Sequence, residues 1–183
     1  MLIQQSHLVL DACCVLNFSA SGHFLEIIKA IPAKVVVSEV VKTQELITLQ
    51  QLESEGNEAV IQFETAINKG LLLIADFESA EEEETFVKYV FELGDDGESA
   101  TGAIAVHREW AIATDDKRAI SFFHQEASQL KIVSTLEVIK FWADSANLSA
   151  SELKNVLKDI RVKGRYVPHK NHPLLDWWQL AMQ

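Results

Sequence analysis

The chain has 183 residues, of which 48% are hydrophobic, enough for one domain with a substantial core. Its formal net charge of −11 at pH 7 argues against a protein that holds nucleic acid through a broad basic surface. The charge is uneven, since residues 1–151 carry −14 and residues 152–183 carry +3. The sequence has no apolar run of about 18 residues and no signal-peptide pattern at its start, so we expect a soluble, cytoplasmic protein outside the membrane.

Five short apolar segments, separated by segments with helical periodicity, are typical of buried strands. The predicted strands are residues 7–11, 34–38, 71–75, 111–114 and 130–133. Strands that alternate with helices from end to end predict a three-layer α/β/α sandwich with a mostly parallel central sheet of about five strands.

In the first half of the chain, residues 24–31 have the apolar spacing of a helix. Residues 39–69 are expected to form two helical pieces, with a break at Gly56 and Asn57. The two cysteines of the chain, Cys13 and Cys14, are adjacent within the apolar run that surrounds Asp11. Neighbouring positions are poorly placed for a disulfide bond or a zinc site, so we interpret both as small buried residues.

In the second half, residues 78–93 have one apolar helical face, preceded by an acidic run from Glu81 to Glu84. We expect this run to be a solvated first turn, favoured by the helix dipole. Further on, residues 149–162 predict an amphipathic helix, and the last residues are expected to be an irregular tail that packs through Trp177 and Trp178.

The domain organisation follows from these segments. Residues 1–145 are expected to form the α/β domain. Residues 146–183, the C-terminal helix and the tryptophan-containing tail, are expected to pack on the same domain as a helical extension.

Acidic residues recur where the predicted strands end. They are Asp11, Glu39, Asp115 and Asp116, joined by Glu98 at the start of the helix before the fourth strand. A single such acid is usually a helix cap, but several at one sheet edge repel one another unless a cation neutralises them. Ligand sites in open parallel sheets form at this edge, so the pattern predicts a hard divalent metal, Mg²⁺ or Mn²⁺, bound by oxygen atoms.

The sequence lacks the motifs of several other kinds of enzyme. The sequence has no phosphate-binding loop of the Gly-x-x-x-x-Gly-Lys-Ser/Thr type, no Gly-x-Gly-x-x-Gly turn and no Gly-x-Ser-x-Gly nucleophile elbow. Position 13 is Cys13, so the second aspartate that an aspartyl-phosphate phosphatase needs after Asp11 is absent.

The chain resembles the PIN-domain ribonucleases, whose best-known members are toxins of toxin-antitoxin systems. The matching stretches are "LVLDACCVLNF", "VVVSEVV", "GESATGAIAV" and, most specific, "AIATDDKRAISFF", which together span about residues 7–133. The resemblance implies a PIN-like fold and a metal-dependent nuclease in which three or four acids hold Mg²⁺ or Mn²⁺ for attack on an RNA phosphodiester.

The resemblance also assigns residues to roles. It implies that Asp11, Glu98 and Asp116 are the first, third and fourth acids, with Asp115 as a helper or cap. The second acid is Glu39 or Glu45, with Glu39 preferred because it directly follows the second strand. The supporting polar residues are Asn17 and Thr114, and the residues that contact the RNA backbone are Lys117 and Arg118.

Three functions stay open at this point. The first is an endoribonuclease, the toxin of a two-protein module that a small antitoxin neutralises, with a homodimer as a further possibility. The second is a catalytically weak PIN-like domain that binds nucleic acid or protein. The third is a different Mg²⁺-dependent α/β enzyme of phosphoryl transfer.

Overall fold

A computed structural model describes residues 3–49 and 58–183, with the backbone alone described for residues 45–49. It confirms the α/β fold with a parallel five-stranded sheet, whose strands are β1 (His7–Leu10), β2 (Lys34–Ser38), β3 (Leu72–Ala75), β4 (Ala111–Ala113) and β5 (Ile132–Val133). All four strand pairs are parallel, in the order β3-β2-β1-β4-β5. Each predicted strand is present to within one or two residues of its expected ends.

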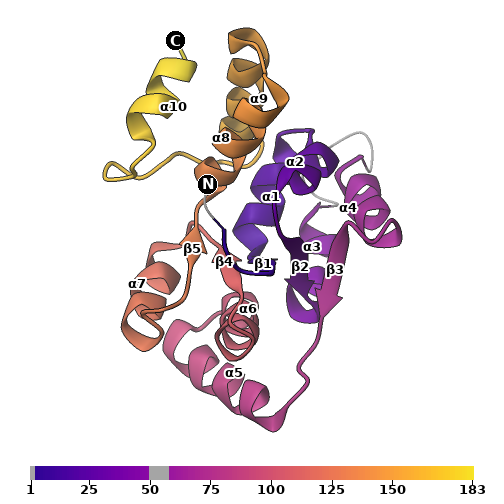
Figure 1. Cartoon of the computed structure of the whole chain (residues 1–183), viewed down its shortest axis with the longest axis vertical. Helices are drawn as coiled ribbons and strands as arrows, with labels where there is room; N and C mark the ends of the chain where they lie inside the picture. Colours follow the sequence, from indigo (N-terminus) through magenta and orange to yellow (C-terminus); the bar gives the residue numbers. More distant parts are fainter. Residues whose placement is uncertain (1–2, 50–57) are drawn as a thin grey trace.

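Helices cover both faces of this sheet, as a three-layer sandwich requires (Figure 1). Within the described residues they are α1 (Ala12–Ala20), α2 (Phe24–Ala30), α3 (Glu39–Leu49), α4 (Glu58–Asn68), α5 (Ala80–Leu93), α6 (Asp96–His107), α7 (Lys117–Glu126), α8 (Thr135–Ala146), α9 (Ala150–Val162) and α10 (Leu175–Ala181). The predicted break at residues 56 and 57 lies outside the described residues.

The two faces of β1 show why its sequence is a continuous apolar run. Leu8 and Leu10 pack in one core with α1, α2, α4 and α8, while Val9 packs in a second core with α5, α6 and α7. Successive side chains of a strand point to opposite faces, and both faces are covered, so all three positions are apolar. This central position of β1 brings its carboxyl end to the middle of the sheet edge.

The C-terminal extension packs on the same core. Val156, Leu157 and Ile160 of α9 and Trp178 of α10 are buried together with side chains of β1 and α1. A capping box between Ser149 and Glu152 begins α9, as the sequence indicates. The last residues, expected to be irregular, instead include the helix α10, and Trp178 is its buried residue.

The helix α1, which begins directly after β1, was not predicted from the sequence. Asp11 is its N-cap, with a side-chain oxygen that accepts a hydrogen bond from the Ala12 N–H, 2.7 Å away. Because α1 starts there, Cys13 and Cys14 lie in its first turn instead of continuing the strand. The strand-to-helix junction therefore places both the acid and the thiols at the carboxyl edge of the sheet.

Candidate functional site

Asp11 is the most buried acid at this edge, with 2% of its surface exposed. Its carboxylate accepts hydrogen bonds from the Thr114 hydroxyl at 2.8 Å and from the Cys13 thiol at 3.2 Å, in addition to the Ala12 N–H. Burial raises the pKa of Asp11 and these hydrogen bonds oppose that rise, while the nearby charge of Asp95 adds to it. Asp11 is thus a buried carboxylate held in one orientation.

Glu98 lies in the first turn of α6, and its environment raises its pKa to about 8. Partial burial is the largest cause, followed by the charges of Asp11, Asp116 and Asp95. In the part of the chain that the structure describes, no hydrogen bond to the Glu98 carboxylate opposes the shift. Three other acids are therefore close enough to Glu98 to act on its protonation.

Asp116 is the N-cap of α7. One of its carboxylate oxygens accepts hydrogen bonds from the backbone N–H groups of Arg118 and Ala119, at 2.7 and 2.8 Å. Its own N–H donates to the Thr114 hydroxyl at 3.2 Å, and the same hydroxyl donates to Asp11. Thr114, predicted as a supporting residue, thus links the first and the fourth acid.

The three acids of the predicted centre are not all close enough to one another to bind a single ion directly. Among the described residues, one set of three ligand atoms lies mutually within 4.8 Å, and it consists of Cys13, Cys14 and Asp115. At least one pair among Asp11, Glu98 and Asp116 is therefore farther apart than 4.8 Å. Direct binding of one ion by all three needs a side-chain movement, for which Glu98, with no hydrogen bond to its carboxylate among the described residues, is the available group.

The chemistry of this donor set suits a hard cation. All three acids offer carboxylate oxygens. Glu98 and Asp116 line a hollow of about 290 Å³ together with Cys13, whose thiol donates a hydrogen bond to the buried Asp11. Mutual repulsion, expressed in the raised pKa of Glu98, is what a divalent ion would relieve. The carboxylate oxygens are therefore suitable ligands for Mg²⁺ or Mn²⁺, although the three acids are too far apart in this structure to bind one ion together.

Asp115 lines the same hollow as Glu98 and Asp116, and its hydrogen bonds join two other parts of the chain to it. Its Oδ1 accepts hydrogen bonds from the Thr135 N–H at the start of α8, 3.1 Å away, and from the Tyr166 hydroxyl at 3.3 Å. Its Oδ2 accepts one from the Asn17 amide at 3.3 Å, and Asn17 also lines the hollow. Of the two roles expected for Asp115, these hydrogen bonds support the cap.

The cysteines approach Asp115 in a way that the sequence did not indicate. The sulfurs of Cys13 and Cys14 and a carboxylate oxygen of Asp115 form the group of mutually close ligand atoms, which could hold a metal ion. Both cysteines are free thiols, and burial raises the pKa of Cys14 well above its ordinary value. Metal binding there would require loss of protons that the thiols hold firmly.

The two residues predicted for the second acid, Glu39 and Glu45, both lie in α3. Glu39 begins α3, and its partly exposed carboxylate forms an ion pair with Lys42 at 2.9 Å. Glu45 lies in the same helix, but its side chain is outside the described residues. Asp95 is a further acid at this edge that was not predicted from the sequence. It caps α6 by accepting a hydrogen bond from the Glu98 N–H at 2.8 Å, and its charge raises the pKa of Asp11 and Glu98. Its signal was an aspartate three residues before Glu98.

Lys117 and Arg118, the two cationic residues predicted to contact the RNA backbone, differ in their surroundings. Arg118 donates from its guanidinium to the carbonyl of Glu92, at 2.5 Å, and so joins the start of α7 to the end of α5. Its charge also lowers the pKa of Glu98. Lys117 is exposed and lines a second hollow beside the acids.

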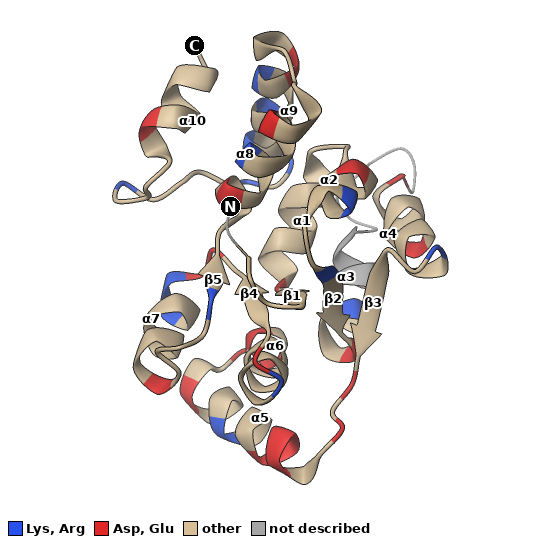
Figure 2. Cartoon of the chain, in the orientation of Figure 1, with Lys and Arg blue, Asp and Glu red and all other residues tan. Residues whose placement is uncertain are grey.

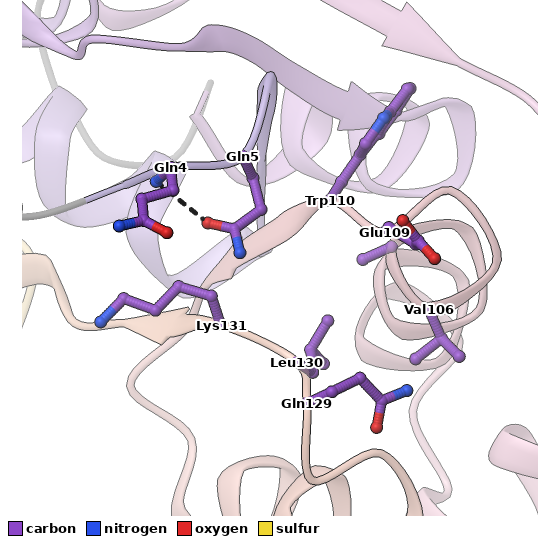
Figure 3. Close-up of a pocket in the computed structure, with 9 residues that line it drawn as sticks. Gln4, Gln5, Val106, Glu109, Trp110, Gln129, Leu130 and Lys131 are labelled. Atoms are coloured by element: carbon purple, nitrogen blue, oxygen red, sulfur yellow. Dashed lines mark hydrogen bonds between the residues drawn. The ribbon is translucent and has the colours of Figure 1, made fainter.

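A separate hollow of about 500 Å³ lies at the amino ends of the strands (Figure 3). Its wall is formed by residues that precede β1, β4 and β5, among them Gln5, Trp110 and Lys131. Glu109 is the one acid among its lining residues. The opposite, carboxyl edge is where the titratable groups gather and where parallel sheets place their ligands, so it is the candidate site.

The fold and this acidic edge define an α/β protein with a carboxylate site at the ends of its parallel strands. No protein-family model matches the chain, and no curated protein matches its sequence. Of the helices in the described ranges, none has both the length and the apolar character needed to cross a membrane.

Proposed function

We propose that the protein is a Mg²⁺- or Mn²⁺-dependent endoribonuclease of the PIN-domain type. The observation that carries the proposal is the pKa of Glu98, which is raised to about 8 by burial and by Asp11, Asp116 and Asp95. Carboxylates that raise one another's pKa are a common feature of functional sites. The three segments that supply them are the β1–α1 junction, the start of α6 and the β4–α7 junction, and they meet at the edge where parallel sheets bind ligands.

The contacts of the three acids suggest a role for each in binding the metal ion. Asp11 is held by Thr114, Cys13 and the Ala12 N–H, and so presents a fixed oxygen. Glu98 and Asp116 would complete the ligand set from the hollow's surface. A bound divalent ion would supply an activated water and stabilise charge on the phosphoryl oxygens.

The biological setting of the proposal rests on the resemblance alone. A nuclease of this kind would act on cytoplasmic RNA and be neutralised by a small antitoxin that covers the site. A homodimer belongs to the same set of proposals.

One observation favours a second candidate, a catalytically weak domain that binds nucleic acid or protein. Asp11, Glu98 and Asp116 are not all within 4.8 Å of one another, whereas ligands of a single ion at 2.0–2.2 Å lie closer than that. If the spacing persists in solution, metal binding would be weak and hydrolysis slow.

Cleavage of a labelled single-stranded RNA, with and without Mg²⁺ or Mn²⁺, tests the proposal. We expect metal-dependent cleavage by the wild-type protein and a loss on the order of 100-fold or more in Asp11→Asn and Glu98→Gln. Glu83→Gln is the matched control, because Glu83 is an exposed acid on α5 outside the site. Absence of cleavage by the folded wild-type protein, or an unchanged rate in Asp11→Asn, would refute the nuclease and leave the binding domain.

A further inference from the structure

A second hollow, of about 570 Å³, adjoins the acidic one. It lies between α7 and the chain segment 165–173, and Asp115, Arg165 and Tyr166 line both hollows. Its volume is within the range of about 300–1,000 Å³ that small-molecule sites occupy. The two hollows are therefore adjacent, and the second is large enough for a small ligand.

The charged residues that line the second hollow are mainly cationic, in contrast to the acidic body of the protein. Its charged and titratable lining residues are Lys117, His124, Arg165, His169, His172 and Asp115. Among the described residues no carboxylate pairs with Lys117 or Arg165. Desolvation and then the charges of Lys117, Lys170 and His172 lower the pKa of the exposed His169, which indicates that these positive groups lie near one another.

The same hollow also has apolar lining residues. They are Ile120, Val167 and Pro173, and 62% of the Val167 surface is exposed. Apolar and cationic lining residues in one hollow match the two parts of a nucleotide, a base and a phosphate. Figure 2 shows the surrounding distribution, with Lys and Arg beside acids on α7 and α9 and mainly acids on α5.

The wall formed by residues 165–173 is fixed relative to the acids. Gly164 packs so closely on α1 that an added Cβ would lie 2.7 Å from Asn17 Oδ1 and 2.8 Å from the Ile160 carbonyl. Two residues on, the Tyr166 hydroxyl donates to Asp115 at 3.3 Å. The hollow is thus built against the acidic site by the C-terminal extension, which lies outside the stretches that resemble PIN domains.

We propose that this second hollow binds one nucleotide of a single-stranded RNA, next to the nucleotide whose phosphate faces Asp11, Glu98 and Asp116. Lys117 and Arg165 contact the phosphate, and the base lies on Ile120, Val167 and Pro173. The position next to a cleaved phosphate rests on the proposed nuclease function, whereas the binding itself does not.

Fluorescence anisotropy of an eight-nucleotide labelled RNA, measured in EDTA so that no hydrolysis occurs, tests the inference. We expect Lys117→Glu and Arg165→Glu each to weaken binding by about tenfold and to reduce its salt dependence. Lys69→Glu is the matched control, since Lys69 is exposed beyond α4 and makes the same change of charge. It is expected to bind within twofold of the wild type. Glutamate at position 117 also suits the start of α7, so that variant should fold.

Three outcomes would overturn the inference. They are no RNA binding by the wild-type protein, equal losses in all three variants, and equally tight binding of a polyglutamate peptide of the same length, which would indicate an acidic protein partner. Failure of the nuclease proposal is distinguishable, because it would appear as absent cleavage with the expected binding losses intact.

Discussion

The Thr114 hydroxyl donates a 2.8 Å hydrogen bond to the carboxylate of Asp11 and accepts a hydrogen bond from the Asp116 N–H. It therefore joins the carboxyl ends of β1 and β4, which are neighbours in the sheet. Both Thr114 and Asp11 are buried, with 1% and 2% of their surfaces exposed. A buried carboxylate depends on such donors, and this relationship gives a direct test of how the acids are positioned.

Thr114→Val keeps the shape of the side chain but leaves the Asp11 carboxylate without one of its donors. We expect the free energy of unfolding to fall by about 1–3 kcal/mol, the cost of an unsatisfied buried polar group. Thr114→Ser retains a hydroxyl and should lose much less. Urea unfolding measures both, and equal stability of the two variants would mean that the hydrogen bond does not support Asp11.

Glu98 predicts a pH dependence of stability in metal-free protein. Its pKa is about 8 in the folded state against an ordinary 4.5, so the folded state holds a proton between these values that the unfolded state has released. Stability should therefore be fully present below pH 4.5 and decline as the pH rises through 8.

Glu98→Gln removes that proton equilibrium and should flatten the decline. Because Glu98 is partly exposed, we expect the variant to gain only about 1 kcal/mol at pH 8 and almost nothing at pH 4.5. Thermal unfolding in EDTA, with Glu83→Gln alongside, measures the effect. A parallel pH profile for wild type and Glu98→Gln would contradict the interpretation.

The acidic first turn of α5 contains one structural acid. Glu82 is 4% exposed and forms an ion pair with Arg108, with distances of 2.7 Å to Nε and 2.8 Å to Nη2. The expectation that all four glutamates of this run are solvated is therefore wrong for Glu82. The hydrogen bonds from Arg108 lower the pKa of Glu82, so its contribution is present above pH 4.5 and is lost as the pH falls through the lowered value.

Glu82→Gln should consequently destabilise the protein by about 2–4 kcal/mol at pH 7, since it leaves Arg108 without its buried partner. Glu83→Gln, one position further along, should change stability by less than about 0.5 kcal/mol. Chemical unfolding at pH 7 distinguishes them. A Glu82 variant as stable as the Glu83 variant would show that the ion pair contributes little.

Gly164 predicts an effect on the C-terminal wall of the site. An alanine there would bring its Cβ against Asn17 and the Ile160 carbonyl, and the backbone must shift to relieve the contact. We expect Gly164→Ala to lower stability by about 1–3 kcal/mol and to weaken RNA binding. Lys163→Ala changes an exposed neighbour whose ion pair contributes little, and serves as the control. Equal stability and equal RNA binding of the two variants would mean that the close packing of Gly164 on α1 does not support the site.

The strands and the layer order were predictable because buried parallel strands have simple sequences. Val35, Val36 and Val37 of β2 and Leu8, Val9 and Leu10 of β1 are apolar on both faces, and the gaps between strands have helical periodicity. The acids at the carboxyl edge were predictable as well, because the apolar segments mark where each strand ends.

Other features depend on contacts between distant residues. The start of α1 was hidden because its apolar residues continue those of β1, with Asp11 as the boundary. The burial of Glu82 depends on Arg108, 26 positions away, and the approach of Cys13 and Cys14 to Asp115 depends on the β1 and β4 pairing. Side-chain spacing at the site, unlike strand order, also depends on rotamers that the residue pattern does not determine.

The central claim is that Asp11, Glu98 and Asp116 share a divalent ion. A crystal structure of the protein with Mn²⁺, in which anomalous scattering locates the ion, tests it most directly. The account predicts one or more anomalous peaks bound by carboxylate oxygens of Asp11 and Asp116, with Glu98 reoriented toward them. A peak on the Cys13, Cys14 and Asp115 group alone, or no peak at this edge of the sheet, would contradict it.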